Sequence, residues 1–226
     1  MSSRIQRPQI GFKYARRDGI IALSLYLLIL VFSFLFYAFN APVYPQPLHL
    51  AAAPVNDLGQ ALTLALLSLA VFAAAMVIRR QPIRSIGWNP ATLRPALLAG
   101  FALAVITIFL RNRFMYILGG QAGDKLIPLL LALGIAMAEE TIFRGYLQLR
   151  LVWWLGPVPG ILLTSALSTL WHVPAWLGRL PVETTLILTG LTFLQALVLG
   201  WAMRKTGHVL VPGFYRAISI WVQFLG

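Results

Sequence analysis

The chain has 226 residues, of which 59% are hydrophobic and 11% are charged, and its mean hydropathy is +0.81. Soluble domains carry about a quarter charged residues, so this composition excludes an ordinary soluble core. The sequence has no cysteine, which excludes disulfides and cysteine-ligated metal. The 18 basic and 6 acidic residues give a net charge of +12, which in a soluble protein would point to nucleic acid.

Several apolar runs approach the roughly 20 residues that a helix needs to cross a bilayer. Backbone polar groups in lipid must be satisfied internally, so spanning helices are expected. The sequence predicts an all-α, polytopic transmembrane bundle of about seven spans: Gly19–Phe39, Leu58–Ile78, Pro95–Leu110, Leu126–Leu147, Ile161–Leu177, Thr184–Met203 and Val209–Leu225. We divide the chain into a basic cytoplasmic tail at 1–18, N-terminal transmembrane helices at 19–110 and a C-terminal helical core at 126–225.

The first apolar run, Ile20 to Phe39, follows basic residues and resembles a secretory signal sequence. It is longer than the apolar part of a signal sequence, and no clear small-residue cleavage site follows it. We therefore expect a retained first helix. With the N-terminus in the cytoplasm, most Lys and Arg residues fall on the inner side, as the positive-inside rule requires. The charge excess thus reports topology, and nucleic acid is not needed to explain it.

Two adjacent acids, Glu139 and Glu140, lie within a predicted span. Charged groups at that depth are costly, so they usually face a protein interior and serve a function. Residues four apart share a helix face, which places Arg144 over Glu140 and turns Glu139 about 100° away. Glu139 is then expected to lack a counter-ion. Desolvation raises the pKa of such a carboxylate, toward the range of a general base.

Counting 1.5 Å of rise per residue along consecutive predicted spans places His172, Gln195 and Arg216 near the level of Glu139. Plainer interpretations stay open for each of these residues. The two glutamates and Arg144 could form an ion-pair cluster that locks helices together. His172 could belong to an interfacial aromatic belt with its neighbouring tryptophans. Arg216 could equally be a site donor or hold helices together, and Gln195 fits a hydrogen bond between helices better than a catalytic role.

The run from Glu139 to Leu147, with Glu-Glu-x-x-x-Arg at its start, resembles the first motif of the CAAX-protease and bacteriocin-processing family, also called the Abi or glutamic intramembrane protease family. Ser168 to His172 resembles the second motif, Phe-x-x-x-His, with serine in place of phenylalanine. Thr206, Gly207 and Pro212 resemble the lead-in to the third motif. The third motif then departs, because Arg216 and Ile220 stand where the family has His and Asn or Asp.

The resemblance implies peptide-bond cleavage within the membrane, with Glu139 and His172 activating a water molecule and with Glu140 and Arg144 supporting the helix geometry. The third-motif pair would stabilise the oxyanion. Arg216 could still donate hydrogen bonds there, or it could bind Glu139 and weaken it as a base. The resemblance therefore also allows a catalytically impaired member that acts as a membrane scaffold or chaperone. A small proton-coupled transporter is a further class, against which the lack of an internal repeat counts.

No cofactor is expected. Catalytic zinc needs three protein ligands, and the alternative set for zinc or another divalent metal is Glu139, His172 and His208, of which we expect His208 to lie too near the membrane surface. The expected partners are membrane lipid and a peptide or protein substrate, without nucleic acid. We expect an integral protein of the bacterial cytoplasmic (inner) membrane. The sequence leaves the identity of the substrate and the oligomeric state open.

Overall fold

The computed structural model describes residues 14–40, 55–120, 122–177 and 179–225, and within these ranges the chain forms helices and no strand. An all-α fold was predicted and is confirmed. The longer helices are α1 (Arg16–Asn40), α2 (Val55–Ile78), α3 (Leu93–Leu110), α5 (Leu126–Glu140), α7 (Pro157–Trp176), α8 (Val182–Thr206) and α9 (Leu210–Trp221), and the shorter ones are α4 (Phe114–Leu118) and α6 (Leu149–Leu155). Short 3₁₀ helices lie at Ile83–Ile86, Pro90–Thr92, Gly123–Lys125 and Val222–Phe224.

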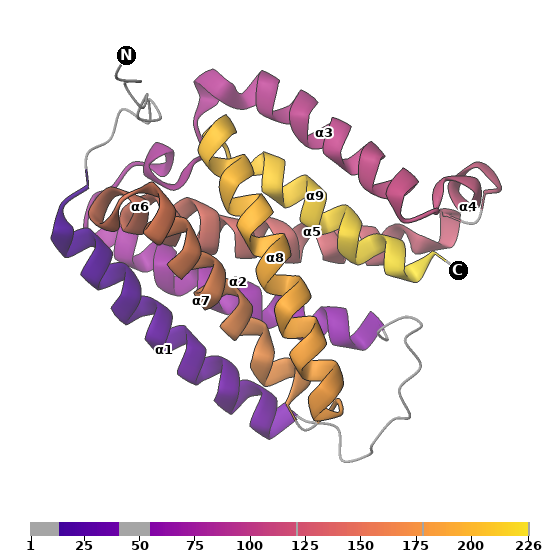
Figure 1. The fold of residues 1–226 in the computed structure, drawn as a ribbon, viewed down its shortest axis with the longest axis horizontal. Helices are drawn as coiled ribbons and strands as arrows, with labels where there is room; N and C mark the ends of the chain where they lie inside the picture. The colour runs from indigo at the N-terminus through magenta and orange to yellow at the C-terminus, as the bar shows by residue number, and fades with distance from the viewer. Residues whose placement is uncertain (1–13, 41–54, 121, 178, 226) are drawn as a thin grey trace.

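Helix α9 occupies a central place, because it packs against both α3 and α5 (Figure 1). Helix α5 also packs against α2. Helix α7 packs against α8 and contacts α1. Segments that are far apart in the sequence are therefore neighbours in the bundle. Side chains from the end of α5, from α7 and from α9 can meet in its interior.

Five helical stretches are long and apolar enough, by length and composition, to cross a membrane: Arg16–Phe39, Leu58–Ile78, Pro90–Leu110, Gly123–Leu155 and Val182–Thr206. Many large apolar side chains on these stretches are exposed, as lipid-facing surfaces require. The chain is therefore an integral membrane protein. The two other predicted spans form α7 and α9 but are not among the five, so the number seven stays a prediction, as does the cytoplasmic N-terminus.

The predicted end of one span, Leu147, is wrong. Helix α5 ends at Glu140, a π-helix follows over Thr141–Gln148, and α6 continues the same rod to Leu155. The connection from α6 to α7 is short. Gly156 alone makes the break, with φ +93°, and Pro157 already occupies the first helical position.

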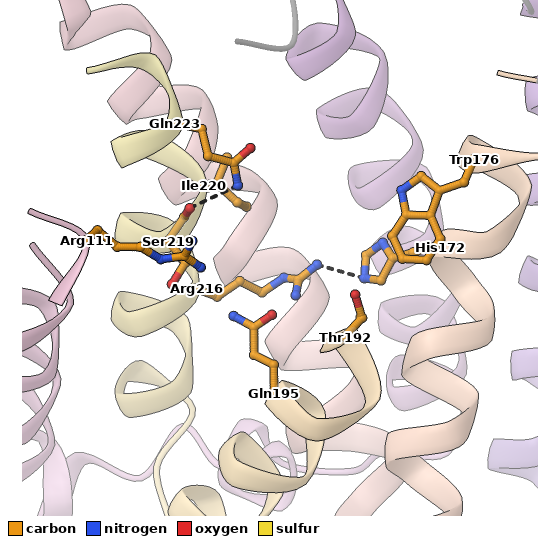
Figure 2. Close-up of a pocket in the computed structure, with 9 residues that line it drawn as sticks. All are labelled: Arg111, His172, Trp176, Thr192, Gln195, Arg216, Ser219, Ile220 and Gln223. Atoms are coloured by element: carbon orange, nitrogen blue, oxygen red, sulfur yellow. Dashed lines mark hydrogen bonds between the residues drawn. The ribbon is translucent and has the colours of Figure 1, made fainter. Parts of the chain in front are cut away.

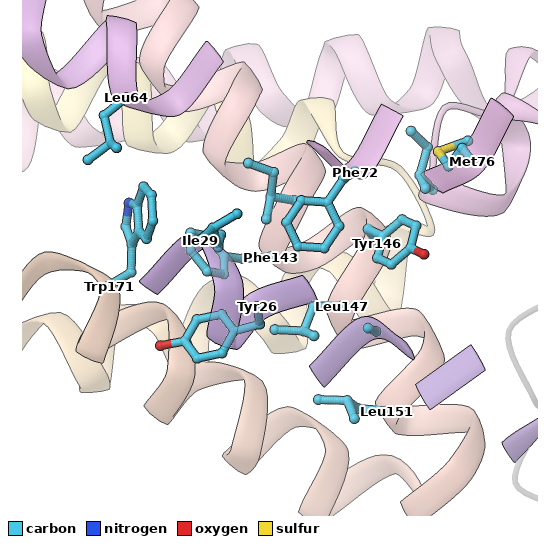
Figure 3. Close-up of a cluster of buried hydrophobic side chains, with 13 residues drawn as sticks. Tyr26, Ile29, Leu64, Phe72, Met76, Phe143, Tyr146, Leu147, Leu151 and Trp171 are labelled. Carbon is cyan, nitrogen blue, oxygen red and sulfur yellow. The ribbon is translucent and has the colours of Figure 1, made fainter. Parts of the chain in front are cut away.

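The π-helix is anchored in the largest apolar cluster of the described residues (Figure 3). Phe143 meets Tyr26 of α1 and Trp171 of α7 edge to face, at ring-centroid distances of 6.4 and 6.0 Å. Tyr146 meets Phe72 of α2 at 4.8 Å. Edge-to-face pairs of this kind add to the stabilisation that burial gives. The segment that follows Glu139 and Glu140 is thereby fixed against three helices.

Gly145, within the π-helix, permits a close backbone approach. A Cβ atom at this position would lie 2.3 Å from the carbonyl oxygen of Ile86. Gly145→Ala is therefore expected to lower the free energy of unfolding by about 1–3 kcal/mol, since the clash is with backbone and requires a backbone shift. Thermal unfolding in detergent measures this effect. Gly190→Ala is the matched control, because a Cβ on Gly190 of α8 meets nothing within 4 Å. Equal melting temperatures for the two variants would contradict the prediction.

Candidate active site

Three predicted site residues, Glu139 of α5, His172 of α7 and Arg216 of α9, form one contact cluster. Oε2 of Glu139 lies 3.9 Å from Nε2 of His172. A single water can join two polar atoms at this separation, because each of its hydrogen bonds spans about 2.7–3 Å. The convergence predicted from helix depth is thus present in the structure. Gln195 also reaches this region, where it lines a cavity with His172 and Arg216 (Figure 2).

Arg216 lies between the carboxylate and the imidazole. Its Nε and Nη2 atoms are each 2.7 Å from Oε2 of Glu139. Nη2 is also 2.7 Å from Nε2 of His172, the contact that Figure 2 shows as a dashed line. Guanidinium nitrogens only donate, so Nε2 of His172 must accept this hydrogen bond. The Nη2 atom of Arg216 therefore occupies the position from which a water molecule would contact both groups.

The expectation that Glu139 lacks a counter-ion is wrong. Helix spacing predicted only intrahelical neighbours, whereas the partner of Glu139 comes from α9, 77 positions later. The carboxylate is buried, with 7% of its side chain exposed, and its charge is compensated by Arg216. A buried carboxylate with a paired guanidinium avoids most of the cost of an unpaired charge.

The expected pairing of Glu140 with Arg144 is present. Nε of Arg144 lies 3.4 Å from Oε2 of Glu140, and both side chains are almost fully buried. Arg144 also donates from Nη2 to the hydroxyl of Ser168 at 3.4 Å. Serine at the position where the second motif usually has phenylalanine thus gives this arginine a polar partner on α7. The hydrogen bond from Arg144 to Ser168 connects the π-helix to α7, the helix that carries His172.

Glu139, His172 and Arg216 line a cavity of about 370 Å³. Its other walls come from α1, α2, α5, α7, α9 and the loop after α7, and they are mainly apolar: Leu58, Ala61, Leu64, Ile135, Trp171, Ala175, Trp176, Leu180 and Ile220. Tyr37 and Arg179, which also line it, form a cation–π contact at 5.2 Å. The polar cluster therefore faces a space that is large enough for water and for apolar groups.

Two tryptophans next to His172 belong to the site in ways that the sequence did not indicate. Trp176 stacks on the imidazole, with ring centroids 5.9 Å apart and planes 29° apart. Trp171 is 3% exposed and packs into the apolar cluster beside the π-helix. Trp171 is therefore a core residue and not part of a lipid-facing belt, and Trp176 contacts His172 directly. Helical spacing alone could not separate these roles.

His208 does not join the cluster. It is 1% exposed; its Nδ1 accepts from the backbone N–H of Leu210, and its ring meets Trp88 edge to face at 5.7 Å. Its expected position near the membrane surface stays a prediction. Burial lowers the pKa of this histidine. In the described part of the chain, no three His, Cys, Asp or Glu side chains are grouped closely enough to hold a metal ion. The alternative ligand set of Glu139, His172 and His208 is not assembled.

These features define an integral membrane protein of helices whose interior carries a carboxylate, an imidazole and a guanidinium at the wall of a cavity. Residues 122–221 match the family model for Rce1-like proteins, described as type II CAAX prenyl endopeptidase Rce1-like. Over this segment the chain is similar to the CAAX-protease family, and the resemblance predicted from its motifs is confirmed. Comparison with curated proteins gave no match, and comparison with solved structures gave none either.

Proposed function

We propose that this protein is an intramembrane endopeptidase that cleaves a membrane-associated or C-terminal peptide, using water activated by Glu139 and His172. The observation that carries the proposal is the 3.9 Å separation of Oε2 of Glu139 and Nε2 of His172 at the wall of a cavity. The match of residues 122–221 to the model of a family described as CAAX prenyl endopeptidases supports the same reaction.

The reaction follows from the two acceptor atoms. A water bound between them donates one O–H to the Glu139 carboxylate and the other to Nε2 of His172, which orients its lone pair toward the substrate carbonyl carbon. Glu139 takes the proton as the oxygen adds to that carbon. The tetrahedral species then collapses, the C–N bond breaks, and the proton passes to the leaving amine. The products are a carboxylic acid and an amine, and neither a metal nor a cofactor is required.

Arg216 has to leave the bridging position before the water can bind there. We infer that the arrangement with Arg216 between Glu139 and His172 is a closed form of the site. A substrate carbonyl offers the guanidinium another acceptor, and its oxygen gains negative charge during the reaction. The mainly apolar walls of the large cavity favour a peptide that carries apolar groups and that approaches from membrane lipid.

A second function is favoured by the same contact of Arg216 with Glu139 and His172. If the guanidinium stays in place, the carboxylate is compensated and no water reaches both groups. The protein would then be a catalytically impaired family member that binds a membrane partner as a scaffold or chaperone. Both functions place it in a membrane, for which the bacterial cytoplasmic membrane stays our proposal.

Cleavage by the purified protein separates the two functions. We expect the full chain in detergent to cleave a prenylated peptide with a C-terminal CAAX sequence, and we expect the rate to be unchanged by EDTA or 1,10-phenanthroline. Mass spectrometry of the products measures both results. Chelators should have no effect because the described carboxylates and imidazoles do not form a metal site. Loss of cleavage on chelation, restored by zinc, would contradict the metal-free mechanism.

A further inference from the structure

A second, smaller cavity of about 150 Å³ adjoins the proposed active site (Figure 2). It shares the side chains of His172, Trp176, Arg216 and Ile220 with the larger cavity. Its remaining walls are polar and come from the end of α3, from α8 and from the end of α9: Arg111, Thr192, Gln195, Ser219 and Gln223. None of the functions discussed above uses these residues.

The chemistry of this smaller cavity is that of an anion site. Arg111 follows the end of α3, and its side chain is exposed, so it stands at the mouth. No carboxylate in the described part of the chain pairs with it, and no Asp or Glu lines the cavity. The charge of Arg216, by contrast, is compensated by Glu139. The cavity therefore has one uncompensated positive charge.

Hydrogen-bond donors line the rest of the smaller cavity. The hydroxyl of Ser219 is buried without a hydrogen-bond partner, and Figure 2 shows the side chains of Thr192 and Gln195 rising from α8 toward Arg216. A buried hydroxyl without a partner is costly, so a ligand that accepts its hydrogen bond gains affinity. A guanidinium together with neutral donors is the arrangement that carboxylates prefer.

We propose that the smaller cavity, with Arg111 as its anchoring cation, binds the free C-terminal carboxylate of the peptide substrate. This assignment rests on the proposed function and names the part of the substrate that this end of the site recognises. The apolar part of the peptide lies in the larger cavity, and the peptide backbone passes His172 and Arg216, which both cavities share. The smaller cavity, at about 150 Å³, has room for a terminal carboxylate.

Equilibrium binding tests the assignment without requiring cleavage. Two fluorescent prenylated peptides of one sequence are compared by anisotropy, one ending in a carboxylate and the other in a carboxamide. The protein is the full chain carrying His172→Gln, which keeps the Glu139–Arg216 pair and prevents turnover. We expect the carboxylate peptide to bind about tenfold to hundredfold more tightly, as hydrogen bonds to charged groups give. Addition of Arg111→Gln is expected to bring this ratio to near one.

The matched control is Arg113→Gln, two positions along the chain. Arg113 does not line the cavity, and its guanidinium lies over the ring of Tyr116 at 5.1 Å. We expect this variant to keep the full preference for the carboxylate peptide. Melting temperatures of both variants in detergent establish that each is folded.

Two results would overturn the assignment: equal affinities for the two peptides before Arg111 is changed, or an undiminished preference after it is changed. The first is also the result expected if a lipid phosphate fills the cavity. Failure of the proposed protease function can be distinguished from failure of the carboxylate site. Selective binding without any cleavage by the native protein would keep the carboxylate site and remove the protease, whereas cleavage of both peptides at equal rates would do the reverse.

Discussion

Glu139→Gln is expected to reduce peptide cleavage by about three orders of magnitude or more, within the range that loss of a general base produces. The amide has the shape of the carboxylate but cannot take a proton from water. It still accepts a hydrogen bond from Arg216, so the contacts of this guanidinium across α5 and α9 are largely kept. Single-turnover rates on the prenylated peptide measure the chemical step.

Glu183→Gln is the matched control for this change. Glu183 lies in the first turn of α8, is exposed, and lines neither cavity. We expect native rates from it. A Glu139→Gln protein that melts at the native temperature and cleaves at the native rate would remove the mechanism. The same logic applies to His172→Ala, since the water would lose its second acceptor.

The double variant Arg216→His with Ile220→Asn is expected to cleave about tenfold faster than the native protein, or more. It restores the third motif of the family and removes the guanidinium from the position between Glu139 and His172. If the closed form dominates by about ten to one, its removal raises the competent fraction by that factor. Initial rates at saturating peptide measure the gain.

Ile220→Asn alone is the control, because it leaves Arg216 in place and should give no gain. Adding Glu139→Gln to the double variant should abolish the gain and so assign it to the same site. A rate below the native one would mean that Arg216 donates hydrogen bonds needed for the reaction. Cleavage by neither the native nor the double variant would favour the scaffold function.

The helical fold was predictable because apolar run length reports membrane spans directly. The ends of the helices were less so. The rod through Glu139 continues to Leu155 because the π-helix and α6 pack against α1, α2 and α7, which apolarity along one segment does not encode. Helix α7 has polar residues on its buried face: Thr164, Ser165, Ser168 and Thr169. Its position in the bundle therefore depends on contacts with other helices, which apolar run length does not report.

The candidate site was predictable as far as residue type and depth along each helix can determine it. The Glu140–Arg144 pair follows from spacing four apart on one helix. The hydrogen bonds of Arg216 to Glu139 and His172 cannot be predicted from spacing, because they depend on how α9 is rotated relative to α5 and α7. The same limit applies to Arg111, whose place in the sequence after a predicted span indicated an exposed loop and gave no sign of the cavity it lines.

The position of α9 between α3 and α5 restricts how the closed form can open. A displacement of this helix would disrupt packing on both of its faces, whereas Arg216 borders two cavities into which its side chain can rotate. Rotation of one side chain is faster than the microsecond-to-millisecond shifts of whole helices. The rate of turnover would then be governed by the arrival of peptide from the bilayer or by the chemical step, and not by a rearrangement of the bundle.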